Sequence, residues 1–411
     1  MRNKRLLQID TCLGVGSTGR ITESIAQLAQ SQGWECYIIH GARYVKRPSC
    51  MKDIQTVSIL GEYLHYAEGM IFDNHGLASR AATRRVVEQI KEIHPDVIQM
   101  HCIHGYYLNY KILFEYFQTI ETPIVWTFHD CWAFTGHCAY FDSIKCEKWK
   151  SGCHDCELKG TYPPTKFLDR SKRNYELKCR LFTSVGKQTV IVPVSYWLED
   201  LVKQSYLKDI RVNTIHNGTD IEVFKPSDGN KLRKQLGVGN KKVVLGVALP
   251  WVPRKGMPDM IKLADMLPND EYRVILVGLD KKQIQTLPNN VMGVMRTNSA
   301  QELAEYYSMA SVFVNPTYED NFPTTNIEAL ACGTPVITYK TGGSPEAVTP
   351  DTGWVVEQGN VDGIAAIVKS FDLKPELEIM TQRKVCRERA KLEFDKDKAF
   401  VKYLNLYNTL I

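Results

Sequence analysis

The 411-residue sequence lacks a long apolar run and lacks a strong charge of either sign. No apolar stretch approaches the roughly 18 residues that indicate a membrane-spanning helix. The apolar run after the basic start ends at Asp10, which does not fit a secretory signal peptide. The net charge of +5 fits a protein that meets phosphates or an anionic surface and does not indicate a nucleic-acid binder. We therefore expect a cytoplasmic protein.

Internal repeats and low-complexity segments are also missing, and 44% hydrophobic with 24% charged residues is an ordinary globular composition. The length exceeds what a single core usually supports, so two domains are expected. The chain has twelve cysteines. Without a secretion signal, these cysteines indicate reduced thiols or metal ligands and not a disulfide scaffold.

Strand and helix patterns alternate through both halves of the chain. This alternation predicts an α/β fold, in which helices cover both faces of mostly parallel sheets. In the first half we expect strands at 6–9, 36–40, 96–101, 124–128 and 189–194, with helices at 21–30, 82–93 and 111–119. In the second half we expect strands at 242–249, 273–277, 312–315 and 336–339, with helices at 257–266, 300–309, 324–332 and 396–410.

A turn signal at His216-Asn217-Gly218 separates the two halves. We therefore expect an N-terminal domain at 1–216 and a C-terminal domain at 217–394, followed by a helix at 395–411. Residues 131–165, rich in Cys, Trp, Gly and Lys, break the alternation as an insertion with little apolar content of its own. Ligands of such folds bind at the carboxyl ends of the strands, and the cleft between two such domains is the expected site.

The stretch GVGSTG, residues 14–19, is a G-x-G-x-x-G between a strand and a helix, the context of a dinucleotide fingerprint. A nicotinamide-binding domain would also need an acidic residue at the end of the second strand, where this chain has His40. The glycines alternatively form a tight turn that needs a positive φ. As a third alternative, the helix N-terminus that they open attracts another anion.

Three stretches of the second half combine charge with glycine. In ALPWVPRKG, Arg254 and Lys255 lie between a strand and a helix, where they form either a diphosphate clamp or two solvated loop charges. In EDNFPTTNIEALACGTPV, Asp320 precedes a helix that carries Glu328. This carboxylate is either a surface group or the acceptor for two ribose hydroxyls, and the helix N-terminus offers free N–H groups. The third stretch, YKTGGSPEAV, places paired glycines after a strand.

Together these stretches resemble the family 4 glycosyltransferases of the GT-B fold, over nearly the whole chain. The family signature, an acidic residue, seven residues, then Glu and A-x-A-x-G-x-P-V, runs here from Asp320 through Glu328. TFHD, VIVPVSYWLEDLV, TIHNGTDIEVFKP and RKG match further segments. The family commonly has Glu where this chain has Asp320, beside Glu319. EDNFP is similar to the branch that makes bacterial capsular polysaccharide, exopolysaccharide and lipopolysaccharide.

The resemblance implies two Rossmann-like domains that face a central cleft, with the C-terminal helix crossing back to the first domain. It also implies the site residues. The catalytic group comprises His129, which in the family contacts the donor sugar, Asp320, Arg254 and Lys255. The nucleotide-sugar site comprises Gly16, Ser17, Arg254, Lys255, Arg296, Asn321, Phe322, Pro323, Thr324 and Glu328. The glycine loop then lets the donor diphosphate and the acceptor approach the backbone, and does not bind a dinucleotide.

The implied reaction is retaining, with the departing diphosphate stabilised by Arg254 and Lys255. The sequence has no suitably placed D-x-D pair to hold a catalytic metal, so no catalytic cofactor is expected. The insertion carries Cys138, Cys146, Cys153 and Cys156, spaced C-x7-C-x6-C-x2-C, with His137 and His154 as spare ligands. These thiols either form a structural zinc site or remain a metal-free reduced cluster.

The resulting hypothesis is sugar transfer from a UDP- or GDP-sugar to a growing, lipid-linked glycan in surface polysaccharide synthesis. The enzyme would contact the inner face of the cytoplasmic membrane peripherally and would use no nucleic acid. One alternative is a sucrose- or trehalose-type synthase that acts on soluble sugars. A second is a non-catalytic sugar-nucleotide-binding module. The donor sugar, the base, the linkage and the oligomeric state leave no trace in the sequence.

Overall fold

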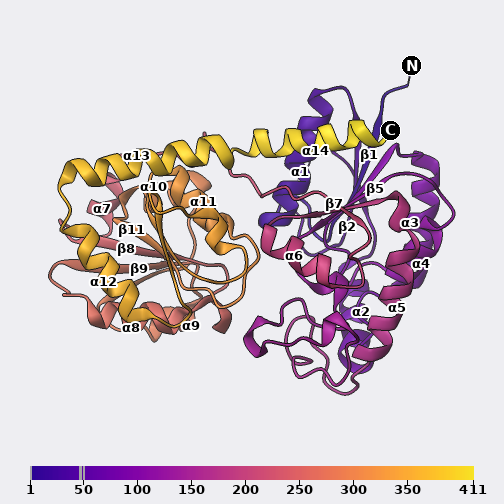
Figure 1. The fold of residues 1–411 in the computed structure, drawn as a ribbon, viewed down its shortest axis with the longest axis horizontal. Coiled ribbons are helices and arrows are strands. Elements are labelled where there is room, and N and C mark those ends of the chain that lie inside the picture. Colours follow the sequence, from indigo (N-terminus) through magenta and orange to yellow (C-terminus); the bar gives the residue numbers. More distant parts are fainter. Residues whose placement is uncertain (1, 46–48, 50) are drawn as a thin grey trace. The chain divides into compact units, whose positions relative to one another are not determined.

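The chain folds into two α/β units in the computed structural model, which describes residues 2–45, 49 and 51–411. The first unit comprises residues 1–216 together with 400–411, and the second comprises 217–399. Figure 1 shows that each unit has a central sheet with helices packed on it. The α/β, GT-B type of architecture expected from the sequence is confirmed, because both sheets are built from parallel strands.

The first unit has a seven-stranded sheet in the order β3-β2-β1-β4-β5-β6-β7. Its strands are β1 (Arg5–Ile9), β2 (Glu35–His40), β3 (Lys52–Gln55), β4 (Val97–Met100), β5 (Ile124–Phe128), β6 (Thr189–Pro193) and β7 (Arg211–Val212). The helices are α1 (Gly16–Ser31), α2 (Ile59–Phe72), α3 (Arg80–Ile93), α4 (Tyr110–Phe117), α5 (Ser171–Ser184) and α6 (Tyr196–Gln204). The central strands are buried almost throughout, as their continuous apolar runs require.

The second unit has a six-stranded sheet in the order β10-β9-β8-β11-β12-β13. Its strands are β8 (Lys242–Val247), β9 (Tyr272–Val277), β10 (Val291–Val294), β11 (Val312–Asn315), β12 (Val336–Tyr339) and β13 (Gly353–Val356). The helices are α7 (Asn230–Gln235), α8 (Met257–Met266), α9 (Lys281–Gln285), α10 (Ala300–Met309), α11 (Thr324–Ala331), α12 (Val361–Asp372) and α13 (Glu376–Glu393). The expected helices at 257–266 and 300–309 are confirmed at both ends.

The last helix, α14 (Lys396–Leu410), begins in the second unit and ends in the first. In the first unit, the Tyr403 hydroxyl accepts a bond from Thr127, and the Tyr407 hydroxyl donates to Gln99. Tyr407 also packs edge-on against Trp34, with ring centroids 5.9 Å apart. The expected crossing of this helix back to the first domain is confirmed.

The segment 131–165 contains three short 3-10 turns, η1 (Trp132–Phe134), η2 (Asp142–Ile144) and η3 (Lys148–Lys150). The expectation that it has little apolar content of its own is wrong. Trp132, Phe134, Phe141 and Trp149 are buried and join the core of the first unit. The rings of Phe141 and Trp149 stack 5.1 Å apart. Aromatic packing therefore already gives this lobe a fixed shape.

Candidate active site

Each unit carries candidate functional residues where the carboxyl ends of its central strands meet. In the second unit, β8 and β11 are neighbours near the middle of the sheet. Arg254 and Lys255 belong to η5 (Pro253–Lys255), which follows β8. Asp320 lies in the loop between β11 and α11. The sheet topology therefore brings together groups that are far apart in the sequence.

Lys255 and Asp320 form an ion pair in which the ammonium donates to the carboxylate, and both side chains are mostly buried. The second carboxylate oxygen of Asp320 accepts the Asn321 N–H at 2.9 Å. Arg254 donates to the Glu319 carbonyl at 2.7 Å, and the Arg254 carbonyl accepts the Tyr318 N–H at 2.7 Å. These contacts fix the cationic loop against the acidic loop.

Gly256 explains how the two loops approach so closely. Its φ is +73°, and a Cβ at this position would lie 2.1 Å from the Pro316 carbonyl oxygen. A side chain there would both strain the backbone and push the η5 turn away from the end of β11. The glycine of the RKG stretch is therefore required by packing, whatever Arg254 and Lys255 bind.

Glu328 is the fifth residue of α11, and its side chain is buried. The Tyr307 hydroxyl donates to its carboxylate at 3.0 Å. Pro323 precedes the first turn of α11, and no side chain caps this helix start. The first-turn N–H groups are thus oriented like those of an anion site. Thr324 is half-buried, whereas Asn321 and Phe322 are buried and support the loop.

Arg296 stands apart from this group. It follows β10, the edge strand, and β9 separates β10 from β8. Its side chain is exposed. Arg296 therefore follows a strand two places from β8 in the sheet, and its nucleotide-binding role stays a prediction.

In the first unit, the glycine loop is the start of α1, because the helix begins at Gly16 and continues through Ser17. Gly16 has a φ of +69°, and a Cβ there would meet no atom within 4 Å. Gly19 has the opposite environment, since its Cβ would lie 2.9 Å from the Cys12 Cβ. The loop thus combines a left-handed turn, a close helix contact and open space beside Gly16.

His129 follows β5 and is half-buried, and its ring lies nearly parallel to that of His101 with ring centroids 5.4 Å apart. The Gln8 amide donates to the Thr22 carbonyl at 2.8 Å, so its oxygen faces His101 Nε2 at 3.2 Å. His101 therefore carries its proton on Nε2 and accepts from His129 Nε2 at 3.1 Å. This network leaves His129 Nδ1 as an acceptor. Burial lowers the pKa of His129 to about 4, which keeps the ring neutral.

Sequence reasoning missed Asp10, His101 and His104 near His129. Burial raises the pKa of the Asp10 carboxyl to about 7, although the Thr22 hydroxyl donates to it at 2.9 Å. His104 Nε2 contacts the Asp130 carboxylate at 2.9 Å. Asp10 and His101 directly follow β1 and β4. The positional rule that singled out His129 would have found both, because each polar residue follows an apolar strand.

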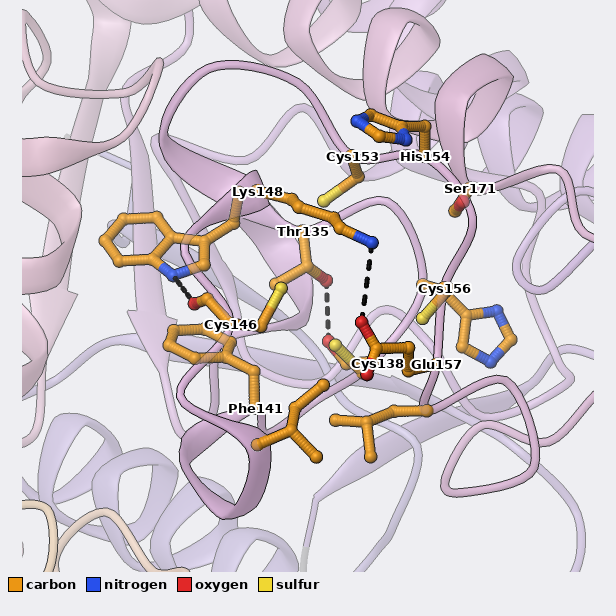
Figure 2. A pocket seen from close by; sticks show the side chains of 14 residues that line it. Thr135, Cys138, Phe141, Cys146, Lys148, Cys153, His154, Cys156, Glu157 and Ser171 are labelled. Carbon is orange, nitrogen blue, oxygen red and sulfur yellow. Dashed lines mark hydrogen bonds and ion pairs between the residues drawn. The ribbon is translucent and has the colours of Figure 1, made fainter.

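Four of the five cysteines of the insertion, Cys138, Cys146, Cys153 and Cys156, line one cavity of about 20 Å³, together with apolar and polar side chains (Figure 2). The Cys138 and Cys156 thiols are hydrogen-bonded, which raises the pKa of Cys138 and lowers that of Cys156. Among the residues that the structure describes, no three of the four sulfurs lie within 4.8 Å of one another. The coordination geometry of zinc is therefore not formed, and zinc stays a prediction.

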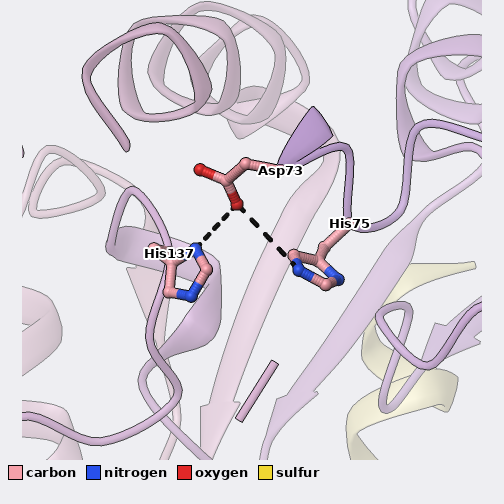
Figure 3. A group of neighbouring side chains, drawn as sticks. All are labelled: Asp73, His75 and His137. Atoms are coloured by element: carbon pink, nitrogen blue, oxygen red, sulfur yellow. Dashed lines mark hydrogen bonds and ion pairs between the residues drawn. The ribbon is translucent and has the colours of Figure 1, made fainter. Parts of the chain in front are cut away.

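A second buried cluster, Asp73, His75 and His137, lies next to this cavity (Figure 3). His137 Nδ1 contacts the Asp73 carboxylate at 2.7 Å, and His75 Nε2 lies 4.0 Å from the same oxygen. The Arg170 N–H donates to the other carboxylate oxygen at 2.7 Å. Because the Asp73–His137 bond is direct, this trio orients His137 and leaves no room for an ion between the two side chains.

Family models match both parts of the chain. The model described as Glycosyltransferase Family 4 matches residues 18–223, and the model described as Glycosyl transferases group 1 matches residues 228–392. The chain belongs to glycosyltransferase family 4. The resemblance of the Asp320–Glu328 signature to this family is confirmed, and the protein is a glycosyltransferase.

Among its relatives is WcaC of Escherichia coli K12, a glycosyl transferase assigned to colanic acid biosynthesis. WcaC is 23% identical over 98% of this chain and 100% of its own length. A D-inositol 3-phosphate glycosyltransferase of Mycobacteroides abscessus is 30% identical, but over only 40% of this chain and 41% of its own.

Solved structures share the fold. The sucrose-phosphate synthase of Thermosynechococcus elongatus superposes with a TM-score of 0.72 at 18% identity, over 99% of both chains. HepE of Anabaena in complex with UDP superposes with a TM-score of 0.68 at 16% identity, over 99% of this chain and 100% of its own. No helix among the described residues is long and apolar enough to cross a membrane.

Proposed function

We propose that this family 4 enzyme is a retaining transferase that moves a sugar from a UDP- or GDP-sugar to a growing, lipid-linked glycan of a surface polysaccharide. The observation that carries the proposal is the Lys255–Asp320 pair at the ends of β8 and β11, with the buried Glu328 carboxylate in the following helix. Three features of this site match the parts of a nucleotide-sugar. Cations neutralise its diphosphate, a carboxylate accepts ribose hydroxyls, and a helix N-terminus offers N–H groups.

In the proposed reaction, the bond from the anomeric carbon to the diphosphate breaks through an oxocarbenium-like state, and the acceptor hydroxyl attacks from the same face. Negative charge builds on the departing phosphate, so Arg254 and Lys255 stabilise the transition state more than the bound donor. Asp320 holds the Lys255 ammonium in place through their ion pair. These fixed cations supply the role that a divalent metal has in other transferases, and we expect activity to be metal-independent.

His129 is proposed to contact the donor sugar. Its neutral ring, with Nε2 committed to His101, presents Nδ1 as an acceptor for a sugar hydroxyl. Such a contact orients the substrate and needs no proton transfer at this histidine.

The surface polysaccharide assignment rests on WcaC, which matches this chain along its whole length. UDP is the first nucleotide to test, because HepE, a structural neighbour at 16% identity, was solved with UDP and with UDP-glucose. The sucrose-phosphate synthase likeness concerns the fold alone at 18% identity, so a soluble-sugar synthase is the second candidate. A non-catalytic module is disfavoured because both the cationic pair and Glu328 are present.

The deciding experiment is a thermal-shift screen of the full chain with UDP, GDP and ADP, followed by product analysis with the matching sugar nucleotides. A diphosphate at 100 times its Kd adds about 2.7 kcal/mol to the stability of the fold that binds it. Stabilisation without turnover, on any lipid-linked or soluble acceptor, would favour the binding module. Products on sucrose-type acceptors would favour the soluble-sugar synthase.

We also propose that α2 provides the peripheral membrane contact that a lipid-linked acceptor requires. The polarity of this surface helix is inverted, since its buried residues are Glu62, His65 and Gly69. The inner polar groups are satisfied: Glu62 accepts from Arg43 at 2.6 Å, and His65 contacts the Ser79 hydroxyl at 2.9 Å. Its exposed residues include Ile59, Leu60, Tyr63, Leu64, Tyr66, Ile71 and Phe72.

The surroundings of this helix favour an anionic lipid surface as its partner. The Lys166 N–H donates to the Met70 carbonyl, which places the exposed Phe167 and Leu168 beside the end of α2. Arg43 lies over the Tyr63 ring at 5.3 Å, and Arg170 lies over Phe72 at 5.8 Å. An apolar stripe with cations at its rim is the pattern of interfacial helices.

A further inference from the structure

Figure 2 shows four cysteine side chains turned toward one small cavity in the lobe formed by residues 131–165. They come from four different turns of a segment with no strand and no α-helix. Each is a free cysteine, and Cys138 and Cys156 are hydrogen-bonded and not bridged. Four thiols that converge without a disulfide are the donor set of a structural zinc site.

The backbone around each thiol is fixed by the rest of the lobe. The Thr135 hydroxyl donates to the Cys138 carbonyl at 2.6 Å, and Trp149 Nε1 donates to the Cys146 carbonyl at 2.9 Å. The Cys156 N–H donates to the Asp169 carboxylate at 2.5 Å. These bonds hold the backbone at the three cysteines. The sulfur positions can therefore change by rotation about the Cα–Cβ bonds, without movement of the backbone.

Gly136 makes the fourth thiol part of the same arrangement. A Cβ at this position would lie 2.7 Å from the Cys153 Cβ and 2.2 Å from the Ser171 carbonyl oxygen. Only glycine lets the 135–138 turn approach the Cys153 turn and the start of α5 this closely. The two halves of the candidate ligand set are therefore packed together by the fold.

Lys178 gives an independent reason to expect negative charge in this cavity. Its side chain is fully buried, and its ammonium donates to the carbonyls of Trp132 and Thr135 at 2.8 and 3.2 Å. Burial lowers the pKa of Lys178 to about 7, and the acidic groups that oppose this are, in order, the thiols of Cys153 and Cys138 and the carboxyls of Asp73 and Asp130. A buried cation is costly unless it is compensated by opposite charge. Ionised sulfurs would provide that compensation.

His137 adds a buried polar atom with no partner. Its Nδ1 is bonded to Asp73 (Figure 3), and its Nε2 is buried without a hydrogen-bond partner. The residue lines the same cavity as the four thiols. This nitrogen is therefore a buried polar atom at the cavity that a bound ligand could satisfy. His154, the other spare candidate, is exposed and contacts Asp155, and so is not needed.

We propose that these four thiols bind one structural zinc ion, with the Lys178 ammonium offsetting part of the charge of the complex. Binding converts four thiols and one Zn²⁺ into a tetrathiolate complex of charge −2 and releases four protons. Zinc–sulfur bonds of about 2.3 Å place tetrahedral sulfurs about 3.8 Å apart. The sulfurs must therefore approach one another on binding. Four protein ligands leave no open position for water, so the ion is structural and independent of the transferase reaction.

The test is elemental analysis of the full chain, purified without chelator and under reducing conditions, which should give one zinc per chain. Cys153→Ser combined with Cys156→Ser should reduce the content to below about a tenth of this value, because two of four ligands are lost. Cys179→Ser, a change in α5 at a thiol outside the cavity, is the matched control and should retain the zinc. A zinc content near zero in the unmodified chain would overturn the proposal.

If the double variant does not fold, the unmodified chain still decides the question. Zinc removed with a chelator should be replaceable by Co²⁺, and the thiolate-to-cobalt charge-transfer bands should report four sulfur ligands. Bands with the intensity of fewer than three sulfurs would contradict the ligand set, as would loss of zinc in His137→Gln with all cysteines intact. Nucleotide-induced stabilisation of the second unit is a separate readout and is expected to persist in the cysteine variants.

Discussion

Lys255 and Asp320 form an ion pair although 65 residues separate them, because β8 and β11 are adjacent in the sheet. Both side chains are largely shielded, at 20% and 16% exposure. A charge pair in this position is stronger than one in bulk water and can hold the ammonium at a fixed point. The aspartate therefore positions the lysine for the phosphate that we propose it stabilises.

Lys255→Ala is expected to reduce kcat by about 100- to 1,000-fold, the range found when one donor to a developing charge is removed. Donor binding should weaken less, because phosphate charge is greatest in the transition state. Steady-state kinetics with the active donor would measure both. Lys255→Arg, which keeps the charge, should retain more activity than the alanine variant. A change confined to KM would make Lys255 a ground-state anchor and would refute its role in leaving-group departure.

Glu328→Gln is expected to weaken nucleoside diphosphate binding, and Glu328→Ala to weaken it further, by about 1.5–3 kcal/mol in total. The loss arises because hydrogen bonds to a carboxylate are stronger than those to an amide. Calorimetric titration with UDP and GDP measures it. Tyr307→Phe is the control, since it removes the protein's own bond to this carboxylate and leaves the charge. If all three variants bound UDP and GDP as tightly as the unmodified chain, ribose binding by Glu328 would be excluded.

The sequence predicted those site residues that follow a recognisable apolar strand. The strand-ending positions of Lys255, Asp320 and His129 were predictable, because periodicity locates strands and parallel strands end at one edge. Their pairing was not, since it depends on strand order: nothing in the sequence states that β8 lies beside β11.

Some of the elements that sequence reasoning missed, such as α2, β3 and β7, have unusual patterns, whereas others, such as α12, carry an ordinary amphipathic stripe. A surface helix is usually recognised by an apolar stripe that faces the core, whereas the apolar face of α2 points outward. The edge strands β3 and β7 are short and largely polar, so alternation does not mark them. The aromatic residues of the insertion belong to the main core, which only the folded arrangement shows.

Activity should survive EDTA in a short assay, because the cations at the proposed diphosphate site are Arg254 and Lys255. Immediate loss of turnover that Mg²⁺ or Mn²⁺ restores would contradict this mechanism. Slow loss that zinc restores would instead reflect the cysteine lobe. The two outcomes are separated by following activity over time in parallel samples with each metal.

The first unit should be destabilised by acid before the second. Burial lowers the pKa of His65 and of His129 to about 4 each, and that of His101 well below its usual value. The unfolded chain takes up protons at these histidines near pH 6.5, whereas the folded chain does not, so stability falls as the pH drops from about 6.5 toward 4. Asp10 opposes this trend, because its raised pKa favours the folded state below about pH 7.

Each histidine contributes up to about 1.4 kcal/mol per pH unit within this window. Denaturant unfolding at several pH values, monitored separately in each unit, would measure the slope. His101→Asn should reduce the slope of the unfolding free energy against pH by the amount that one titrating proton contributes. A flat profile between pH 6.5 and 4.5 would show that these rings are protonated in the folded state.

Substitution of the exposed face of α2 should weaken binding to anionic vesicles without changing the fold. Leu60 and Leu64 are 68% and 64% exposed, so Leu60→Glu with Leu64→Glu removes no core contact. Burying one leucine is worth about 1.5–3 kcal/mol, and we therefore expect a loss of roughly tenfold or more in vesicle partitioning. Co-sedimentation with phosphatidylethanolamine–phosphatidylglycerol vesicles measures it. Binding should also weaken with salt, because cations flank the helix.

The matched control changes two exposed leucines in the second unit, Leu373→Glu with Leu377→Glu, and should bind vesicles like the unmodified chain. Turnover on a soluble acceptor analogue should be unaffected in both double variants, since neither touches the proposed donor site. Selective loss of turnover on the lipid-linked acceptor in the α2 variant would connect this surface to acceptor delivery. Equal vesicle binding by both double variants would exclude α2 as the membrane contact. Concentration-dependent dimerisation that is lost only in the α2 variant would instead assign its apolar face to a second copy of the chain.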